Sequence, residues 1–291
     1  QSILYDVISI FYALLFADIL LILGVSGCVV LPLVKLISSK KIIVNIDGLE
    51  WKRAKWGKAA KWFLKFSERV AVKFSDEIIA DNKVIQEYVL SKYGKKAALI
   101  AYGADHTCKE AFSMAVLHQF PFLSEKYAFK VCRIEPENNV HLILEAFSEY
   151  PLLNIVLVGN WNNSAYGKQL KLQFDSFENI YLLEPIYNQN ILNQLRSNCY
   201  LYIHGHSAGG TNPSLVEAMY LELPIIAYDI NYNIETTANK ARYFKSKIDL
   251  TNHLKSLNKS EISSIGLEMK NIANDNYTWN LISEKYSKLF F

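Results

Sequence analysis

The sequence has few of the residues that build metal sites or interrupt folds. Its 291 residues include only four cysteines, seven prolines and 12 glycines. The four cysteines form no CxxC pair, which argues against a zinc site and indicates thiols kept reduced in a cytoplasm. Neither an Asp-x-Asp nor an HExxH motif occurs, so we expect no metal. With 51% hydrophobic residues, the chain is predicted to bury one large core or two ordinary ones rather than to be disordered.

The chain also lacks a strong net charge, because 31 basic and 28 acidic residues leave only +3. The distribution is uneven: residues 51–65 (WKRAKWGKAAKWFLK) carry six basic residues and no acidic one. Indoles suit the lipid headgroup layer, and cations suit anionic lipid or a pyrophosphate. We therefore expect an acceptor or membrane contact made by Trp51, Lys52, Arg53, Lys55 and Trp56. A solvated helix face is the alternative, and nucleic acid is disfavoured because the rest of the chain is not basic.

One long uncharged run, residues 19–34, raises the question of a membrane span. Gly24, Gly27 and Pro32 interrupt it, and it falls short of the ~20 residues that a spanning helix needs. No basic segment precedes the apolar start of the chain, so a signal peptide does not fit. The run instead predicts a buried strand with flanking turns.

Short apolar runs alternate with helical stretches along the whole chain. Strands are expected at residues 17–23, 41–46, 77–80, 98–101, 127–132, 154–158, 180–183, 199–204 and 224–228, and helices at 56–71, 82–93, 140–150, 189–197 and 213–221. Strands that are apolar throughout and alternate with helices imply parallel sheets covered on both faces. The fold class is therefore α/β with two Rossmann-like domains, and ligands should bind outside the carboxyl ends of the strands.

A glycine-rich loop follows one of these strands, at residues 207–219 (SAGGTNPSLVEAM). Asn212 can cap the helix after it, and Pro213 suits its first position. Such a helix start presents free N–H groups and a positive dipole end, which suit a phosphate. Glu217 lies four residues after Pro213 and therefore on the same face of the helix. There its carboxylate can accept hydrogen bonds from a ribose diol. A tight turn with an ordinary surface glutamate is the alternative.

Three segments together resemble glycosyltransferase family 4, a retaining family of the GT-B fold, and within it a bacterial rhamnosyltransferase branch. They are NIDGLEWKRAKW at 45–56, VCRIEPENN at 131–139 and HGHSAGGTNPSLVEAM at 204–219. The resemblance covers essentially the whole chain. It implies two domains facing across a cleft: an acceptor-binding domain at 1–120 and a nucleotide-sugar-binding domain at 121–275, with a C-terminal helix at 276–291 returning to the first. Family members begin with a strand and a glycine-rich loop that this sequence lacks, so an N-terminally truncated first domain is expected.

The resemblance assigns a donor site residue by residue. Glu217 matches the glutamate expected to hold the ribose, and Arg133 matches the arginine that binds the donor diphosphate. Fixed cations and N–H donors must neutralise a diphosphate when no metal does so. An ion pair of Arg133 with Glu135 or Glu137 is the alternative. The expected donor residues are Arg133, His206, Gly209, Gly210, Thr211, Asn212 and Glu217.

The sequence departs from the family pattern at two donor positions. The family's first glutamate would fall at Gly209, and its usual lysine at Asn138. The rhamnosyltransferase branch shares the second variation, so we interpret it as a mark of subtype. The backbone N–H groups of Gly210, Thr211 and Asn212 are expected to take over part of the phosphate contact. His204 and His206 flank a glycine beside this loop, and either contact the donor or are ordinary loop histidines.

Asp47 follows the predicted strand at 41–46, where the wider family often has a histidine at the catalytic cleft. A carboxylate there can accept the proton of the acceptor hydroxyl or hold that hydroxyl in line. Glu50, three residues later, is the rival for this role. The alternative for Asp47 is a turn-forming Asp-Gly pair.

The resulting expectation is a retaining glycosyltransferase, peripheral at the cytoplasmic face of the plasma membrane and without a cofactor beyond its nucleotide-sugar substrate. The branch implies transfer of rhamnose from dTDP-rhamnose onto a lipid-linked saccharide in bacterial surface polysaccharide synthesis. The alternatives are the same fold with a mannosyl or galactofuranosyl donor, or a non-catalytic membrane-surface binding protein on a decayed transferase fold. The missing glutamate, lysine and N-terminal segment favour that last alternative somewhat.

Overall fold

The computed structural model describes residues 2–53 and 56–291, and its contacts divide the chain into two compact units. Unit 1 comprises the residues up to Ala101 together with Ala208–Thr211 and Ile282–Phe291, and unit 2 comprises Tyr102–Ser207 and Asn212–Leu281. This division falls after Ala101, whereas the sequence-based boundary lay at residue 120. Each unit contains a parallel sheet, so the predicted α/β class with two Rossmann-like halves is confirmed. Lys55, one of the expected contact residues, lies outside the described residues.

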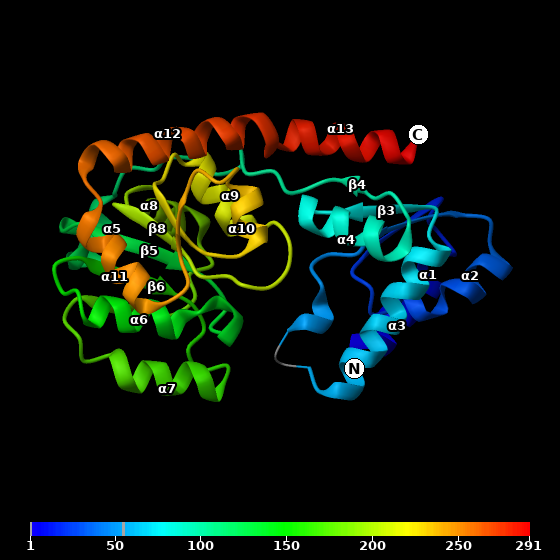
Figure 1. Cartoon of the computed structure of the whole chain (residues 1–291), viewed down its shortest axis with the longest axis horizontal. Helices are drawn as coiled ribbons and strands as arrows, with labels where there is room; N and C mark the ends of the chain where they lie inside the picture. Colours follow the sequence, from blue (N-terminus) through cyan, green and yellow to red (C-terminus); the bar gives the residue numbers. More distant parts are fainter. Residues whose placement is uncertain (1, 54–55) are drawn as a thin grey trace. The chain divides into compact units, whose positions relative to one another are not determined.

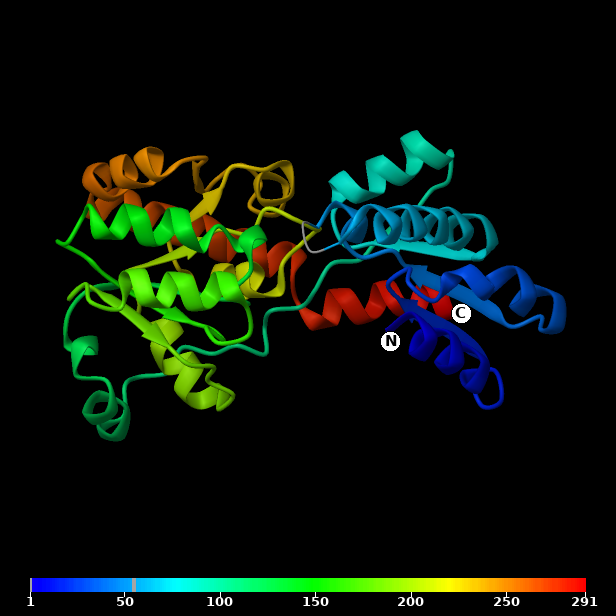
Figure 2. The ribbon, with the colours of Figure 1, turned by 90° about the horizontal axis from the view of Figure 1, so that it is seen from below.

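Unit 1 is built on a sheet whose four strands lie in chain order and are all parallel. They are β1 (Ile19–Leu23), β2 (Lys41–Asn45), β3 (Glu77–Ala80) and β4 (Ala98–Leu99). Helices α3 (Lys58–Phe74) and α4 (Lys83–Tyr93) cover one face (Figures 1 and 2). The end of α13 (Trp279–Phe290) lies along the other face, where Lys41 Nζ donates a hydrogen bond to the carbonyl of Leu289 at 2.5 Å.

The uncharged run at 19–34 divides into more elements than the sequence predicted. Its first part forms β1, but its end is a 3-10 turn (Cys28–Val30) that leads into α2 (Leu31–Ile37). Pro32 stands in the first turn of α2, where its missing N–H is no cost. The segment before β1, apolar on most sides, is α1 (Ser2–Ala13). Among the described residues, no helix is both long enough and apolar enough to cross a bilayer.

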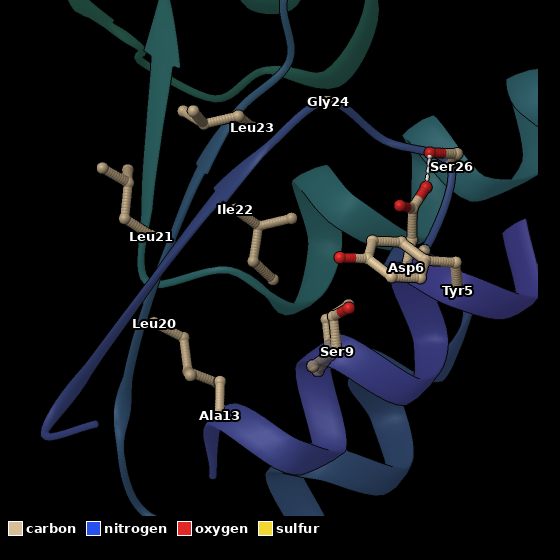
Figure 3. Close-up of a pocket in the computed structure, with 12 residues that line it drawn as sticks. Tyr5, Asp6, Ser9, Ala13, Leu20, Leu21, Ile22, Leu23, Gly24 and Ser26 are labelled. Atoms are coloured by element: carbon tan, nitrogen blue, oxygen red, sulfur yellow. Dashed lines mark hydrogen bonds between the residues drawn. The ribbon is translucent and has the colours of Figure 1, made fainter. Parts of the chain in front are cut away.

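A groove of about 250 Å³ lies between α1 and β1 in unit 1 (Figure 3). Its walls are largely apolar, with Ile10, Leu20 and Ile22 among the lining residues. At one end, the Ser26 hydroxyl donates a hydrogen bond to Asp6 (Figure 3). Asp6 is the one charged side chain among the lining residues, so the groove offers no cation to a phosphate. Cationic side chains line a pocket in unit 2 instead.

Unit 2 is built on a parallel sheet in the order β10-β9-β8-β5-β6-β7. The strands are β5 (Tyr127–Val131), β6 (Asn154–Val158), β7 (Ile180–Leu183), β8 (Leu201–His204), β9 (Ile225–Tyr228) and β10 (Arg242–Phe244). The chain enters at the centre in β5, moves outward to β7, returns to β8 on the other side of β5, and moves outward again. The strand order therefore reverses between β5 and β8, which is where ligands bind in open α/β sheets.

Helices cover both faces of this sheet. Figure 1 shows α6 (Val140–Ser148), α7 (Ala165–Phe174) and α11 (Lys247–Ser256) on one face, and α8 (Gln189–Ser197), α9 (Pro213–Tyr220) and α12 (Lys259–Asn276) on the other. The shorter helices α5 (Met114–Gln119) and α10 (Asn231–Thr236) belong to connections. Fully buried side chains such as Phe129, Phe147 and Trp161 fill the core. This rigid packing fixes the loops at the carboxyl ends of β5 and β8.

Candidate functional site

A pocket of about 330 Å³ lies in unit 2, at the carboxyl ends of β5 and β8 where the strand order reverses. Its walls come from both strand ends and from helices α8 and α9. The lining residues are Lys130, Val131, Cys132, Arg133, Asn138, Gln189, Leu192, Arg196, His204, His206, Asn212, Pro213, Ser214 and Glu217. Three lining side chains are lysine or arginine and one is a carboxylate, so the pocket favours an anionic ligand.

The start of α9 forms one wall, but its first N–H groups are already used. The Asn212 side chain accepts from Ser214 N at 3.0 Å, and the Asn212 carbonyl accepts from the N–H groups of Leu215 and Val216. The helix therefore offers the pocket its positive dipole end but not the free N–H groups expected at these positions. The cationic side chains of the pocket add to this dipole end, and the phosphate contact expected from the N–H groups of Gly210, Thr211 and Asn212 stays a prediction.

Two loops that line the pocket are held together by asparagine side chains. Asn138 Nδ2 donates to the carbonyl of Arg133 at 2.8 Å, which leaves its Oδ1 to accept from His206 Nδ1 at 3.0 Å. Asn139 donates to the carbonyl of Gly205 at 2.8 Å. A Cβ on Gly205 would lie 2.2 Å from the Asn138 carbonyl, so only glycine fits there. Asn138, which stands where the family usually has lysine, is thus a buried structural residue that orients His206.

Arg133 follows β5 and its side chain is 63% exposed. Its nearest acidic group, Glu135, is 3.9 Å from Nη1, at the outer limit of an ion pair. Such an exposed ion pair contributes little to the stability of the fold. The guanidinium that the sequence singled out therefore lines the pocket with most of its hydrogen-bonding capacity available.

Glu217 lines the pocket from α9, and both of its carboxylate oxygens are held by other side chains. One oxygen forms an ion pair with Arg196, whose side chain is only 2% exposed. The other lies 3.1 Å from His106 Nε2. Because the Trp279 indole donates to His106 Nδ1 at 3.1 Å, the ring hydrogen is on Nε2 and is donated to Glu217. A carboxylate accepts about four hydrogen bonds, so Glu217 keeps capacity for a diol while its orientation is fixed.

Sequence reasoning missed two basic residues of this pocket, Lys130 and Arg196, and left His204 open between a donor contact and an ordinary loop histidine. Lys130 and His204 are each 1% exposed, and burial lowers the pKa of both side chains. The charges of Lys130 and His206 lower the pKa of His204 further, well below 6.5. One signal was present in the sequence: a lysine inside the apolar strand YAFKVC is unusual, because buried lysines are rare.

Only the part of segment 207–219 from Asn212 onward lines the pocket. Gly209, Gly210 and Thr211 belong to unit 1 and are not among the lining residues. Thr211 is buried, and its hydroxyl donates to the carbonyl of Asp81 at 2.6 Å. Gly209 has a φ of 96°, a conformation that strains any residue with a Cβ, which explains why glycine stands where the family has glutamate. Of the expected donor residues, the structure gathers Arg133, His206, Asn212 and Glu217.

Asp47 and Glu50 differ sharply in their surroundings in unit 1. Asp47 follows β2 with a φ of 55°, in the left-handed region, and its N–H donates to Asn45 Oδ1 at 2.9 Å. Non-glycine residues in this region often mark functional sites. Glu50 Oε2 lies 2.8 Å from Arg53 Nε, and its Oε1 accepts from the Trp56 indole at 3.1 Å. Both oxygens of Glu50 are engaged locally, which favours Asp47 for a proton-accepting role.

The expected acceptor and membrane residues are partly occupied with structural contacts. The Trp51 indole donates to the buried Glu68 at 2.8 Å, and Lys65 Nζ lies 4.3 Å from its ring centroid. Arg53 and Trp56 contact Glu50, while Lys52 is exposed. Two aromatic side chains of α3 that follow this segment do face solvent: Trp62 is 69% exposed, and its ring stacks on Phe66 with the centroids 5.9 Å apart. Within the described ranges, no cluster of metal-binding side chains forms.

Comparisons with known proteins agree with this architecture. The family model described as "Glycosyl transferases group 1" matches residues 118–264, half of the chain, and "Domain of unknown function (DUF1972)" matches residues 1–105. No curated protein matches the chain in sequence.

Many solved structures have a similar fold, and three of them illustrate the likeness. Sucrose-phosphate synthase from Thermosynechococcus elongatus aligns with a TM-score of 0.79 and 12% identity, over 97% of this chain and 75% of that one. Anabaena HepE, solved with UDP and glucose, gives 0.79 and 15%, over 98% and 80%. The pneumococcal O-GlcNAc transferase GtfA, solved with UDP and GlcNAc, gives 0.65 and 15%, over 97% of this chain and 58% of that one.

Proposed function

This chain belongs to the group 1 glycosyl transferases, and from that membership we propose that it transfers a sugar from a nucleoside diphosphate donor bound in the pocket of unit 2. The observation that carries the proposal is the pocket at the β5–β8 switch point, which joins Arg133, Arg196 and Lys130 with one oriented carboxylate. The cations suit a diphosphate, and Glu217 suits a ribose diol. HepE and GtfA were solved with UDP and a sugar, which supports a ligand of this class.

The finer proposal is that the donor is dTDP-rhamnose and that the sugar is transferred with retention onto a lipid-linked saccharide in surface polysaccharide synthesis. It rests on the resemblance of segments 45–56, 131–139 and 204–219 to the rhamnosyltransferase branch. Arg133 would stabilise the leaving diphosphate, where negative charge develops. We propose that no metal or cofactor is needed.

Thermal unfolding in the presence of nucleotides tests this proposal. A ligand at a hundredfold excess over its Kd stabilises the folded state by about 2.7 kcal/mol, so dTDP should raise the melting temperature more than UDP or GDP. Protection by UDP or GDP alone would contradict dTDP-rhamnose as the donor and would indicate a donor that carries the protecting nucleotide. If no nucleotide protects the chain, the alternative of a non-catalytic binding protein is favoured, and the enzyme proposal is wrong.

Replacing Asp47 with asparagine should lower turnover about 10²- to 10⁴-fold, the range for loss of a general base. Asparagine tolerates the left-handed backbone as well as aspartate does, so folding should be unchanged. Nucleotide protection should also be preserved. Steady-state kinetics check this, with Glu50→Gln measured beside Asp47→Asn because Glu50 is the rival for the role. Wild-type turnover in Asp47→Asn would mean that Asp47 does not accept the proton.

We propose that α3 meets an anionic membrane surface through Trp62, Phe66 and the neighbouring lysines Lys58 and Lys65, which are exposed. Burying two aromatic side chains in the headgroup layer contributes more than 1.4 kcal/mol, so replacing both with alanine should weaken vesicle binding at least about tenfold. Co-sedimentation with anionic and neutral vesicles measures this. The control replaces Leu152 and Leu172, which are 82% and 88% exposed in unit 2. Equal binding by both double variants would exclude α3 as the contact.

A further inference from the structure

His204 is a buried polar side chain that the fold leaves without a partner. It ends β8, is 1% exposed, and lines the pocket. Among the residues that the structure describes, neither ring nitrogen has a hydrogen-bond partner. A buried polar group without a partner costs free energy, so such groups are rare and point to a ligand or a water at that place.

The side chain of His204 is directed toward the helices that carry the rest of the site. It lies two residues from Tyr202 on the same face of β8, and the two rings stack with centroids 6.2 Å apart. The charges of Arg196 on α8 and Glu217 on α9 act on Tyr202, so this face of β8 looks toward α8 and α9. The unpartnered nitrogens are therefore at the pocket side of the strand.

Lys130, from the neighbouring strand β5, is a buried cation without an acidic partner. It is 1% exposed and lines the same pocket, and its charge acts on His204. No carboxylate of residues 2–53 or 56–291 lies within ion-pair distance of its ammonium group. Burying a cation without compensation is strongly unfavourable, and a structural role would be served better by an apolar side chain.

We propose that His204 and Lys130 form the floor of the pocket as a phosphate-binding subsite. Resting on the proposed function, this inference assigns the phosphate to a nucleoside diphosphate: the imidazole donates an N–H to a phosphate oxygen, and the ammonium group supplies the charge. Asn138, which also lines the pocket, supplies no cation, and its side chain is hydrogen-bonded to the Arg133 carbonyl and to His206.

A proton is taken up when the anion binds. In the free pocket, burial lowers the pKa of both His204 and Lys130, and the charges of Lys130 and His206 lower the pKa of His204 further. The negative charge of a bound diphosphate raises the pKa of both side chains. In the pH window between the pKa of the free pocket and that of the complex, the side chain therefore gains a proton on binding. Affinity should fall as pH rises through that window. The other groups facing the pair are Cys132, Arg133, Arg196, His206 and Glu217.

Titration calorimetry with inorganic pyrophosphate and with the nucleotide that protects best tests the subsite. In Lys130→Met, pyrophosphate affinity should fall about tenfold to a hundredfold, as for loss of a charged hydrogen bond. Heats measured in buffers of different ionisation enthalpy should show fewer protons taken up than in the wild type. The apo variant should melt at the same or a higher temperature, because an apolar side chain replaces a buried amine that has no acidic partner.

His204→Phe keeps a ring beside Tyr202 but removes both nitrogens, so it should weaken pyrophosphate binding as well. Lys126→Met, at an exposed lysine just before β5, is the matched control and should bind as the wild type does. Unchanged affinity and proton uptake in both pocket variants would overturn the subsite while leaving the donor pocket in place. A wild-type chain that binds neither pyrophosphate nor any nucleotide would overturn the proposed function as well.

Discussion

Replacing Glu217 with leucine is expected to lower the free energy of unfolding of unit 2 by roughly 3 to 5 kcal/mol. Arg196 is 2% exposed, and Glu217 is its carboxylate partner. Without Glu217, the guanidinium keeps only its hydrogen bond to Asn193 Oδ1 at 3.0 Å, and its Nε is already unpartnered among the described residues. A buried arginine cannot shed its proton, so the whole penalty falls on stability.

The double variant Arg196→Met with Glu217→Leu should recover most of this loss, because a buried ion pair can often be replaced by apolar residues at little cost. Glu149→Gln is the matched control. Its pair with Lys247 is exposed at 39% and 49%, so its removal should change stability by less than about 1 kcal/mol.

Hydrogen exchange of β5 and β8 in urea measures the effect in unit 2 alone, since two units need not unfold together. Equal losses in the single and double variants would mean that the two side chains are not coupled. All Glu217 variants should lose nucleotide protection, because none of them offers a carboxylate to a diol. The double variant should therefore be as stable as the wild type, or nearly so, and yet not bind the nucleotide.

The arrangement of the fold was largely predictable from the sequence, because strands buried on both faces read as continuous apolar runs. The predicted strands at 77–80, 154–158 and 180–183 coincide with β3, β6 and β7. The helix α1 was not predicted, because SILYDVISIFYA is apolar on most sides and merges with the run after it. Strand order was also out of reach, since only the tertiary fold places β8 beside β5.

The site residues that belong to a local sequence motif were predictable, whereas those that depend on contacts between residues far apart in the sequence were not. Arg133 and Glu217 come with local patterns after strands. Arg196 has no such pattern, and it becomes meaningful only because α8 packs where its guanidinium meets Glu217, 21 residues away. The same holds for His106, which contacts Glu217 from 111 residues away. Asn138 is a case in which the local pattern suggested only the loss of a cation. In the structure its side chain holds two loops together through hydrogen bonds to Arg133 and His206.

Replacing Arg133 with alanine should leave stability within about 0.5 kcal/mol of the wild type, in contrast to Glu217→Leu. The side chain is 63% exposed, and its nearest acidic group is 3.9 Å away. Arg242→Ala is the matched control for loss of a partly exposed arginine, since that residue pairs with Glu261 away from the pocket and is 46% exposed. Neither variant should shift the thermal unfolding of the apo chain.

Sugar transfer should nevertheless fall about 10²- to 10³-fold in Arg133→Ala and remain unchanged in Arg242→Ala, because a group aimed at developing charge acts mainly in the transition state. Arg133→Lys should be intermediate, since an ammonium group keeps the charge but cannot hold two phosphate oxygens in one plane. The measurement is kcat and KM with the donor that the nucleotide screen identifies. A change in KM alone would mean that Arg133 binds donor and transition state equally. If kcat/KM stays at the wild-type value, the diphosphate does not contact this arginine, and the charge that offsets it must come from the floor of the pocket.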